Sequence, residues 1–481
     1  MNRRLKKRIA LIVILLAIAA VFCFRLTEAQ EKRKSETTNS SSSVTAFIGV
    51  NLVPMDSERV LENQTVIVRD GRIAEIGAAN KIKVPKDAVQ IDGRGKFLMP
   101  GLADMHAHLQ IGAGTLDDAA GQQLQLFLMN GVTTVRNMIG KPEHLLLRDR
   151  INKGELVAPT IFTAGAPMIV NLIPSPEAAV KAVTEQKAAG YDLLKVHEGL
   201  SPETYQAIVE TANKVGIPFA GHVTATVGLE RALKAKQTSI EHLDGYIQFI
   251  IADNSPVKPT GSQVQLGEVL NYVDEKKIPA VIKATKDANV WNTPTLTLFQ
   301  IIVSPKKSED LLKLPELKYV PQKVRDAFAR QKQGTENIPA DEGEKYTRLR
   351  FRLVRELEKA GAKLMIGSDP GQMFLVAGFG THKELESFVE AGLTPFQALE
   401  AATKNPAEYL SEFMKIPNDF GVVKTGNKAD LLLLDANPLQ SVSNTEKIAG
   451  VMTRGRWISK DEIQKTLAAI AAKQESSPAA K

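Results

Sequence analysis

Histidine, lysine and aspartate residues stand at the ends of several apolar runs in this chain, where they could bind a metal ion. The pattern begins with His106 and His108, which follow an apolar run at residues 97–100. Residues at positions i and i+2 of an extended chain point to the same side, and histidine is the commonest protein ligand of metals. Five of the seven histidines fall at such positions, so chance placement is a poor explanation. The other candidates of this kind are Lys195, His197, His222, His242 and Asp369.

The chemistry of these side chains is that of a site for one or two divalent ions. Neutral imidazoles suit zinc and similar ions, and aspartate supplies an anionic oxygen. The single cysteine, Cys23, lies in an N-terminal apolar run, so the rest of the chain has no thiolate ligand. Burial readily lowers the pKa of a lysine. The neutral amine of Lys195 could then react with carbon dioxide to give a carbamate that bridges two ions. An internal salt bridge is the alternative interpretation of Lys195.

The elements that must position these residues are predicted to be eight strands alternating with helices. The apolar runs lie at residues 98–104, 132–136, 160–164, 193–197, 219–222, 239–243, 293–298 and 363–368. Strand–helix alternation predicts a parallel sheet, and eight repeats predict a (β/α)8 barrel over residues 98–420. Active sites of such barrels lie at the carboxyl ends of the strands, which is where the candidate ligands fall.

Both segments that flank this barrel are rich in short alternating apolar runs with turn signals. Residues 44–97 and 421–460 are therefore predicted to form one small β-sandwich, built from both terminal segments. Residues 461–481 are expected to form an amphipathic helix followed by a polar tail.

The N-terminus has the layout of a targeting segment. Residues 1–29 contain basic residues, an apolar run and small residues before Ala29, which predicts a secretory signal cleaved after Ala29. Residues 30–43 have the composition of a solvated linker. The predicted location is secreted or periplasmic, and the alternative is a protein anchored to the membrane by an uncleaved N-terminal segment.

The net charge of +7 gives no argument for nucleic-acid binding. Residues 1–29 carry six Lys or Arg and one Glu, so the rest of the chain has a net charge of only +2. The predicted partner is a small-molecule substrate and not a nucleic acid. A membrane contact is expected only through an uncleaved N-terminus, and a homo-oligomer is left open.

The motifs around the candidate ligands resemble those of the amidohydrolase superfamily. Within it, the chain is similar to the group that contains imidazolonepropionase and the lysine-carboxylated Xaa-Pro dipeptidases (prolidases). The resemblance covers nearly the whole chain after the linker. Its main motifs are PGLADMHAH at 100–108, GVTTVR at 131–136, YDLLKV at 191–196, GHV at 221–223, EHL at 241–243 and GSD at 367–369.

The resemblance implies a metal-binding role for six residues. They are His106, His108, Lys195, His222, His242 and Asp369. Carboxylated Lys195 would bridge two ions, the more buried of which is held by the first two histidines and Asp369. If Lys195 is unmodified, the resemblance implies one ion without it, and His242 would then stabilise the charge that develops on the substrate. Zinc is the expected metal.

The implied activity is hydrolysis of C–N amide bonds. A metal-activated water attacks the carbonyl carbon, and Asp369 acts as general base and then as general acid toward the leaving amine. The predicted substrates are Xaa-Pro dipeptides or N-acyl amino acids. The alternatives are a cyclic amide such as an imidazolone, a lactone or ester, and a secreted metal-binding protein without turnover. Arg136 is predicted to be a charge partner inside the barrel. Substrate contacts are predicted for His197, His382, Tyr246 and Thr295.

Overall fold

The structure is a computed structural model that describes residues 44–110, 118–257 and 266–476. The predicted signal segment and linker lie outside the described residues, as does the end of the tail. Within the described ranges, no helix combines the length and the apolar character that a membrane span requires.

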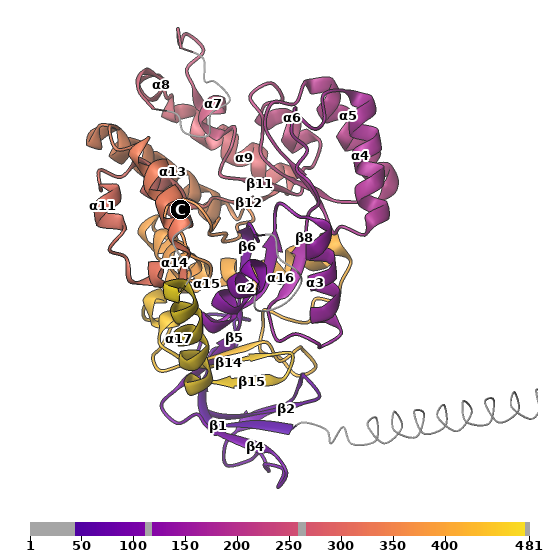
Figure 1. The fold of residues 1–481 in the computed structure, drawn as a ribbon, viewed down its shortest axis with the longest axis vertical. Coiled ribbons are helices and arrows are strands. Elements are labelled where there is room, and N and C mark those ends of the chain that lie inside the picture. The colour runs from indigo at the N-terminus through magenta and orange to yellow at the C-terminus, as the bar shows by residue number, and fades with distance from the viewer. Residues whose placement is uncertain (1–43, 111–117, 258–265, 477–481) are drawn as a thin grey trace, which may run out of the picture.

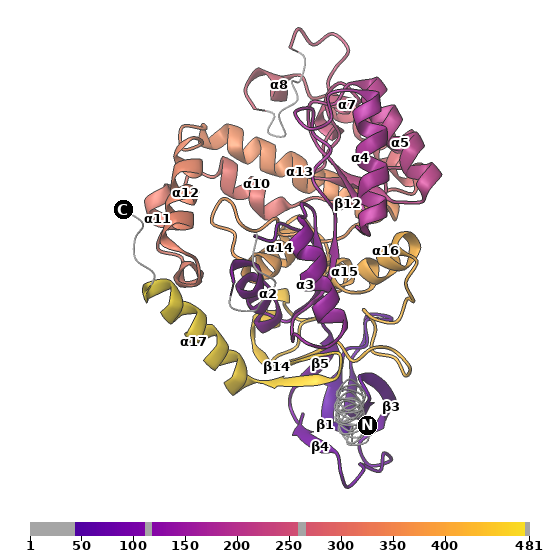
Figure 2. The same cartoon turned by 45° about the vertical axis from the view of Figure 1, so that its right-hand side comes forward.

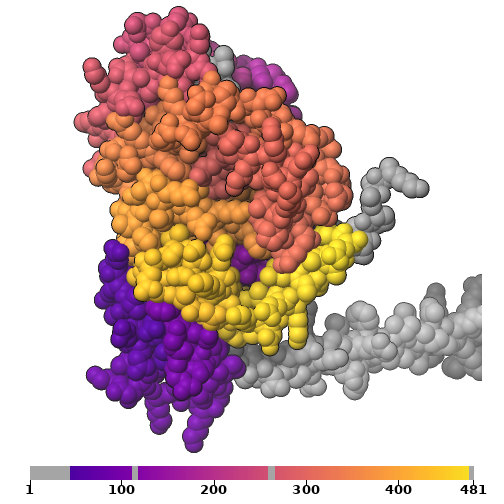
Figure 3. Space-filling view, turned by 90° about the vertical axis from the view of Figure 1, so that its left-hand side faces the viewer, coloured from indigo at the N-terminus to yellow at the C-terminus, as the bar shows by residue number. Residues whose placement is uncertain are grey.

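Segments from both ends of the described chain form one eight-stranded sheet at the base of the molecule (Figure 1). Its path runs β15-β14-β13-β5-β1-β2-β3, and β4 pairs with β1. Figure 3 shows the N-terminal segment in indigo and the C-terminal segment in yellow adjoining in this region. Residues 421–426, which belong to the predicted β-rich segment at 421–460, contain no strand. The strands are β1 (Val44–Leu52), β2 (Leu61–Arg69), β3 (Arg72–Ala78), β4 (Val89–Asp92), β5 (Phe97–Pro100), β13 (Leu431–Leu434), β14 (Ile448–Thr453) and β15 (Arg456–Ser459).

The chain crosses from this sheet to the next layer at Gly101. The sequence predicts one strand over residues 98–104, but the structure divides it into β5 and β6 (Leu102–Ala107). The first part pairs antiparallel with β13, and the second pairs parallel with β7 (Val132–Asn137). A Cβ atom on Gly101 would lie 2.4 Å from the Thr133 side chain, so the crossing needs glycine. One apolar run therefore serves two sheets.

Parallel strands in two further sheets carry the candidate ligands. One sheet has the order β6-β7-β8 and the other has the order β12-β11-β10-β9. Isolated parallel bridges join Ala164 to Leu193 and Asn292 to Leu364, next to the sheet edges. Residues 363–368, the predicted eighth strand, contain only one bridge residue, although the Met105 N–H donates to the Ile366 carbonyl at 3.0 Å. The remaining strands are β8 (Thr160–Thr163), β9 (Leu194–Val196), β10 (Phe219–Gly221), β11 (Ser239–Glu241) and β12 (Trp291–Thr293).

Helices between these strands cover the parallel layer, in agreement with an α/β fold. Helices α4 (Pro176–Ala189) and α5 (Pro202–Val215) show why the sequence forms them. Each begins with a serine N-cap and a proline, and each ends at a left-handed glycine. The other helices of the first half of the chain are α2 (Ala119–Met129), α3 (Pro142–Asn152), α6 (Leu229–Lys234) and α7 (Tyr246–Ile250).

The second half of the described chain is mostly helical. Helix α17 (Lys460–Ser476) leaves β15 and runs along the flank of the molecule, where it contacts α2 and β14 (Figure 2). The others are α8 (Glu268–Asn271), α9 (Ile278–Ala288), α10 (Leu296–Val303), α11 (Ser308–Leu311), α12 (Gln322–Gln333), α13 (Ala340–Ala360), α14 (Phe379–Glu390), α15 (Pro395–Ala402) and α16 (Lys404–Met414).

Candidate active site

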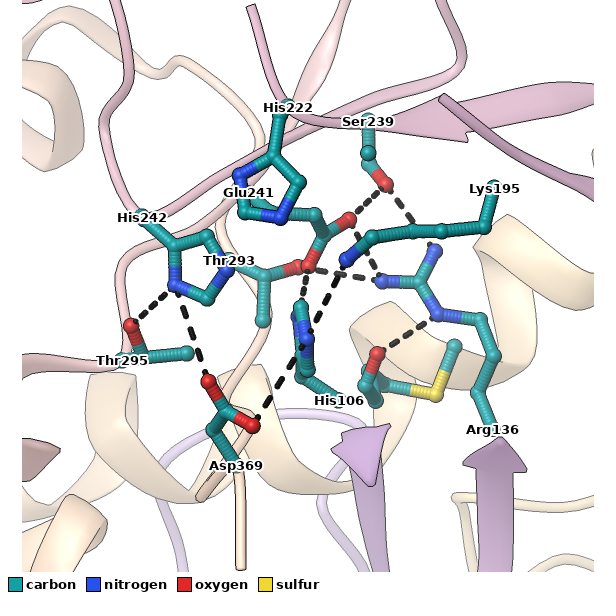
Figure 4. Close-up of polar contacts among 12 residues, drawn as sticks. His106, Arg136, Lys195, His222, Ser239, Glu241, His242, Thr293, Thr295 and Asp369 are labelled. Atoms are coloured by element: carbon teal, nitrogen blue, oxygen red, sulfur yellow. Dashed lines mark hydrogen bonds and ion pairs between the residues drawn. The ribbon is translucent and has the colours of Figure 1, made fainter. Parts of the chain in front are cut away.

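Five histidine rings form a continuous row at the carboxyl ends of β6, β9, β10 and β11. The ring centroids of His108 and His106 are 5.1 Å apart, and those of His106 and His242 are 4.6 Å apart. The row continues from His242 to His222 at 4.8 Å and from there to His197 at 4.5 Å. The structure thus brings together residues that are far apart in the sequence. Figure 4 shows that Lys195 and Asp369 also point toward His106.

His106, His108 and Asp369 form a cluster suited to a metal ion. One ligand atom from each lies within 4.8 Å of the other two. His108 Nε2 is 3.1 Å and His106 Nε2 is 3.9 Å from Asp369 Oδ1. That buried oxygen makes no well-aligned hydrogen bond in the described structure. Since a buried, poorly satisfied carboxylate oxygen is costly, the donor set fits a divalent cation.

Three of the histidines are anchored through Nδ1. In each case the Nδ1–H donates to a buried oxygen, which places the lone pair on Nε2, the nitrogen that would bind a metal. The Thr295 hydroxyl donates to the Pro294 carbonyl at 2.8 Å, so it accepts from its histidine partner. The contacts are His106 to Glu241 Oε2 at 2.7 Å, His222 to Asp244 Oδ2 at 2.8 Å and His242 to Thr295 Oγ1 at 2.8 Å.

Burial sets the protonation states of these groups. It lowers the pKa of His106, His222 and His242 well below the ordinary value of 6.5, so all three rings are neutral and able to bind a metal. Burial also lowers the pKa of Lys195 to about 8. The Lys195 Nζ lies 3.3 Å from His106 Nε2 and therefore belongs to the same cluster.

Asp369 remains a carboxylate although it is buried. Burial alone would raise its pKa, but the hydrogen bond from His108 and the positive charge of Lys195 oppose this effect, and the pKa lies well below its usual range. The backbone at Gly367, two residues before Asp369, lies tightly against β6. A Cβ atom on Gly367 would be only 2.5 Å from the His106 Cβ. Asp369 is thus an ionised acceptor at neutral pH.

Left-handed backbone conformations gather at this site. His242, Thr295 and Asp369 have φ angles of 62°, 49° and 51°. Such angles are uncommon for residues other than glycine, and they cluster where a side chain must be aimed in a particular direction. In this case they turn the side chains at the ends of three segments toward the histidine row.

The buried Asp104, which the sequence analysis did not select, holds the Asp369 segment in place. Its carboxylate accepts from the Ser368 N–H at 3.1 Å and from the Ser368 hydroxyl at 2.5 Å. The Thr381 hydroxyl donates to it at 2.7 Å. Asp104 precedes His106 by two residues in the same strand, so the alternation of a strand was the available signal.

A buried ion pair lies beside the histidine row. Arg136 Nη2 lies 2.8 Å from Glu241 Oε1, and both side chains are fully buried (Figure 4). Arg136 also donates to the Met105 carbonyl at 2.6 Å and to Ser239 Oγ at 2.9 Å. The predicted role of Arg136 as an internal charge partner agrees with this geometry. The sequence analysis did not select Glu241, although it lies two residues after Ser239 in β11 and therefore points to the same side of the strand.

Asp244 is expected to tune the metal affinity through His222. The Asp244→Asn variant should bind a divalent ion about 10- to 100-fold more weakly, because the amide oxygen holds the His222 ring less firmly than the carboxylate does. Competition with a chromogenic chelator measures this affinity. Asp253→Asn, which changes an exposed aspartate paired with Lys277, is the matched control. Equal affinities in all three proteins would refute the role of Asp244.

A pocket of about 850 Å³ opens onto this site. Its apolar lining includes Ile139, Ile169 and Val170. Site residues and Glu198 also line the pocket. The volume suits a small organic molecule. The site residues that line it are His108, His197, His222, His242 and Asp369.

Of the four predicted substrate contacts, His197 alone lines this pocket. Its Nδ1 accepts from the Glu198 N–H at 2.8 Å, and burial lowers its pKa to about 3. The neutral ring must therefore carry its proton on Nε2, which makes His197 a hydrogen-bond donor rather than a metal ligand. Thr295 acts only through His242, because it is fully buried behind that ring.

The predicted substrate contacts of His382 and Tyr246 are not supported by the structure. Both nitrogens of His382 are engaged, with Thr445 Oγ1 at 2.7 Å and the Asn130 carbonyl at 3.0 Å. The buried Tyr246 hydroxyl donates to Asn292 Oδ1 at 2.7 Å. Neither residue is among those that line the pocket, so their substrate contacts stay predictions. The motif at His382 is explained by packing, because a histidine buried in the core needs hydrogen-bond partners for both ring nitrogens.

Residues 97–458 match the Amidohydrolase family, and the chain belongs to that family. Members of this family are usually metal-dependent hydrolases of C–N bonds that act on small molecules, so the protein is such a hydrolase of C–N bonds.

The individual relatives are distant in sequence, but their similarity extends over most of each chain. Ochratoxinase from Aspergillus niger is 24% identical over 471 aligned residues, which cover 84% of each chain. A solved structure of a putative prolidase from Bifidobacterium longum is 23% identical and has a TM-score of 0.65, covering 89% of this chain and 99% of that one. A Xaa-Pro dipeptidase with bound methionine is 20% identical with a TM-score of 0.63, covering 87% of this chain and 100% of that one. The two structures establish the likeness of fold alone.

Proposed function

We propose that this protein hydrolyses the amide bond of Xaa-Pro dipeptides or of N-acyl amino acids with the help of a divalent metal. The observation that carries the proposal is the cluster of His106, His108 and Asp369, whose ligand atoms lie within 4.8 Å of one another beside an 850 Å³ pocket. The structural likeness to proteins described as prolidases supports the dipeptide class.

The donor set supports one or two ions, with zinc as the proposed metal. His106, His108 and Asp369 would hold one ion, and His222 and His242 a second, with a carboxylated Lys195 shared between them. When bound, such an ion lowers the pKa of a water molecule and polarises a carbonyl group.

The chain's own residues then divide the remaining work. Asp369 is ionised and accepts a proton from the attacking water. It returns that proton to the nitrogen of the leaving amine. If Lys195 is unmodified and a single ion is bound, His242 stabilises the negative charge that develops on the carbonyl oxygen. His197 donates from Nε2 into the pocket and orients the substrate.

The proposed architecture extends the observed sheets. The two parallel sheets are proposed to be arcs of one (β/α)8 barrel over residues 98–420, joined through the bridges at Ala164 and at Leu364. Residues 44–97 and 421–460 would form the accompanying β-sandwich. Residues 1–29 are proposed to direct export, with the linker at 30–43 following them.

Metal analysis tests this proposal directly. Protein purified without chelators should hold about two ions per chain if Lys195 is carboxylated, and Lys195→Met should hold about one. Chelation should abolish hydrolysis of Ala-Pro or N-acetyl amino acids, and added zinc should restore it. Lys332→Met is the matched control, since Lys332 is also a fully buried lysine but binds the carbonyls of Ile302 and Ser304. A protein that neither retains nor regains an ion would rule out the proposed mechanism.

A further inference from the structure

Glu198 stands in the active-site pocket immediately after His197. Its backbone is held on both sides, because its N–H donates to His197 Nδ1 at 2.8 Å and its carbonyl accepts from the Val170 N–H at 3.4 Å. The residue lines the same pocket as His222 and Asp369. Its position is therefore fixed relative to the candidate ligands, and it is close enough to contact a bound substrate.

The Glu198 carboxylate has no cationic partner among the described residues. Partial burial and the neighbouring carboxylate of Asp244 both raise the pKa of Glu198, and so disfavour its ionised form. A partly buried anion without a counter-ion is destabilised, and an entering cation would relieve that cost. In the part of the chain that the structure describes, no lysine or arginine lines the pocket, so no guanidinium or ammonium at its wall competes for Glu198.

The apolar residues that line the pocket add a second constraint. Ile139, Ile169 and Val170 offer a surface for an aliphatic group, and Val170 is 39% exposed. A substrate that fills the pocket would therefore place an apolar part against these residues and a positively charged nitrogen near Glu198.

We propose that Glu198 is a specificity residue that binds a cationic nitrogen of the substrate, so that amides carrying an ammonium group are preferred over uncharged N-acylated ones. This inference rests on the proposed amide hydrolysis and narrows its substrate class. The cation could be the α-ammonium group of a dipeptide or the side chain of a basic residue, and both sources place the same chemistry at Glu198.

Three substrates separate these sources in the metal-loaded enzyme. They are Ala-Pro, N-acetyl-Ala-Pro and N-acetyl-Lys-Pro. The Glu198→Gln variant should lose about 10- to 100-fold in kcat/KM on the cationic substrate, mainly through KM, because a charge-assisted hydrogen bond is lost. Hydrolysis of N-acetyl-Ala-Pro should not change. Glu198→Asp keeps the charge and should recover part of the loss, and Glu203→Gln, which alters an exposed glutamate at the start of α5, is the control.

Each outcome has a defined meaning. A selective loss on Ala-Pro supports the proposal with the α-ammonium as the cation, and a selective loss on N-acetyl-Lys-Pro supports it with the side chain as the cation. Equal effects on all three substrates, or no effect on any, overturn the role of Glu198 but leave amide hydrolysis intact. If the metal-loaded wild-type enzyme cleaves none of the three and no N-acyl amino acid, the proposed function fails, and this inference fails with it.

Discussion

The Asp369→Asn variant is expected to lose about three orders of magnitude in kcat for amide hydrolysis. The carboxylate is buried, but the hydrogen bond from His108 and the charge of Lys195 favour its ionised form and its pKa lies well below the usual range, so the wild-type group is a proton acceptor at neutral pH. An amide of the same size cannot accept and return that proton. The loss should appear in kcat more than in KM, because the proton transfer belongs to the chemical step.

Metal content measured on the same variant separates the two roles proposed for Asp369. A variant that retains its ion and still loses activity has lost the acid–base group. A variant that loses its ion as well has lost a ligand, and activity at saturating zinc then gives the remaining effect. If Asp369→Asn kept kcat within about tenfold of the wild type with the ion bound, Asp369 would not be the general base.

The Glu241→Gln variant is expected to lower the free energy of unfolding of the metal-free protein by about 3–5 kcal/mol. Glu241 and Arg136 are both fully buried and lie 2.8 Å apart. Removing the carboxylate charge leaves a buried guanidinium without a counter-ion, and it also weakens the anchor of His106 Nδ1 at 2.7 Å. The urea midpoint, followed by circular dichroism, measures the change.

An exposed ion pair provides the control for this experiment. Lys283 and Asp287 pair across one turn of α9 with both side chains exposed, and such pairs contribute little to stability. Asp287→Asn should therefore leave the urea midpoint unchanged. A midpoint for Glu241→Gln that matched this control would show that the buried pair is not required for stability.

The sequence located the candidate ligands because their chemical types and their places at strand ends are local properties. His106, His108, Lys195, His222 and Asp369 each follow or occupy a recognisable apolar run, and the structure brings them together. The groups that hold them in place were harder to find. Such partners come from other strands, as when Asp104 binds Ser368 across 264 residues of sequence, and no local pattern encodes that proximity.

The errors have equally specific causes. His382 was selected from a motif, but whether its ring faces the pocket depends on how α14 packs, which the motif does not encode. The strand at residues 98–104 was predicted as one element because its apolar run is continuous. The break at Gly101 arises from close contact with Thr133, a residue of the neighbouring strand.

The pairing of β5 with β13 has a consequence for the order in which the molecule can be assembled. Leu98 pairs with Leu433, so one edge of β5 has its partner near the far end of the chain. During synthesis, that edge remains open until β13 has emerged, and an open apolar strand edge is a template for pairing with other chains. The strand that leads directly to His106 and His108 is thus completed among the last steps of folding.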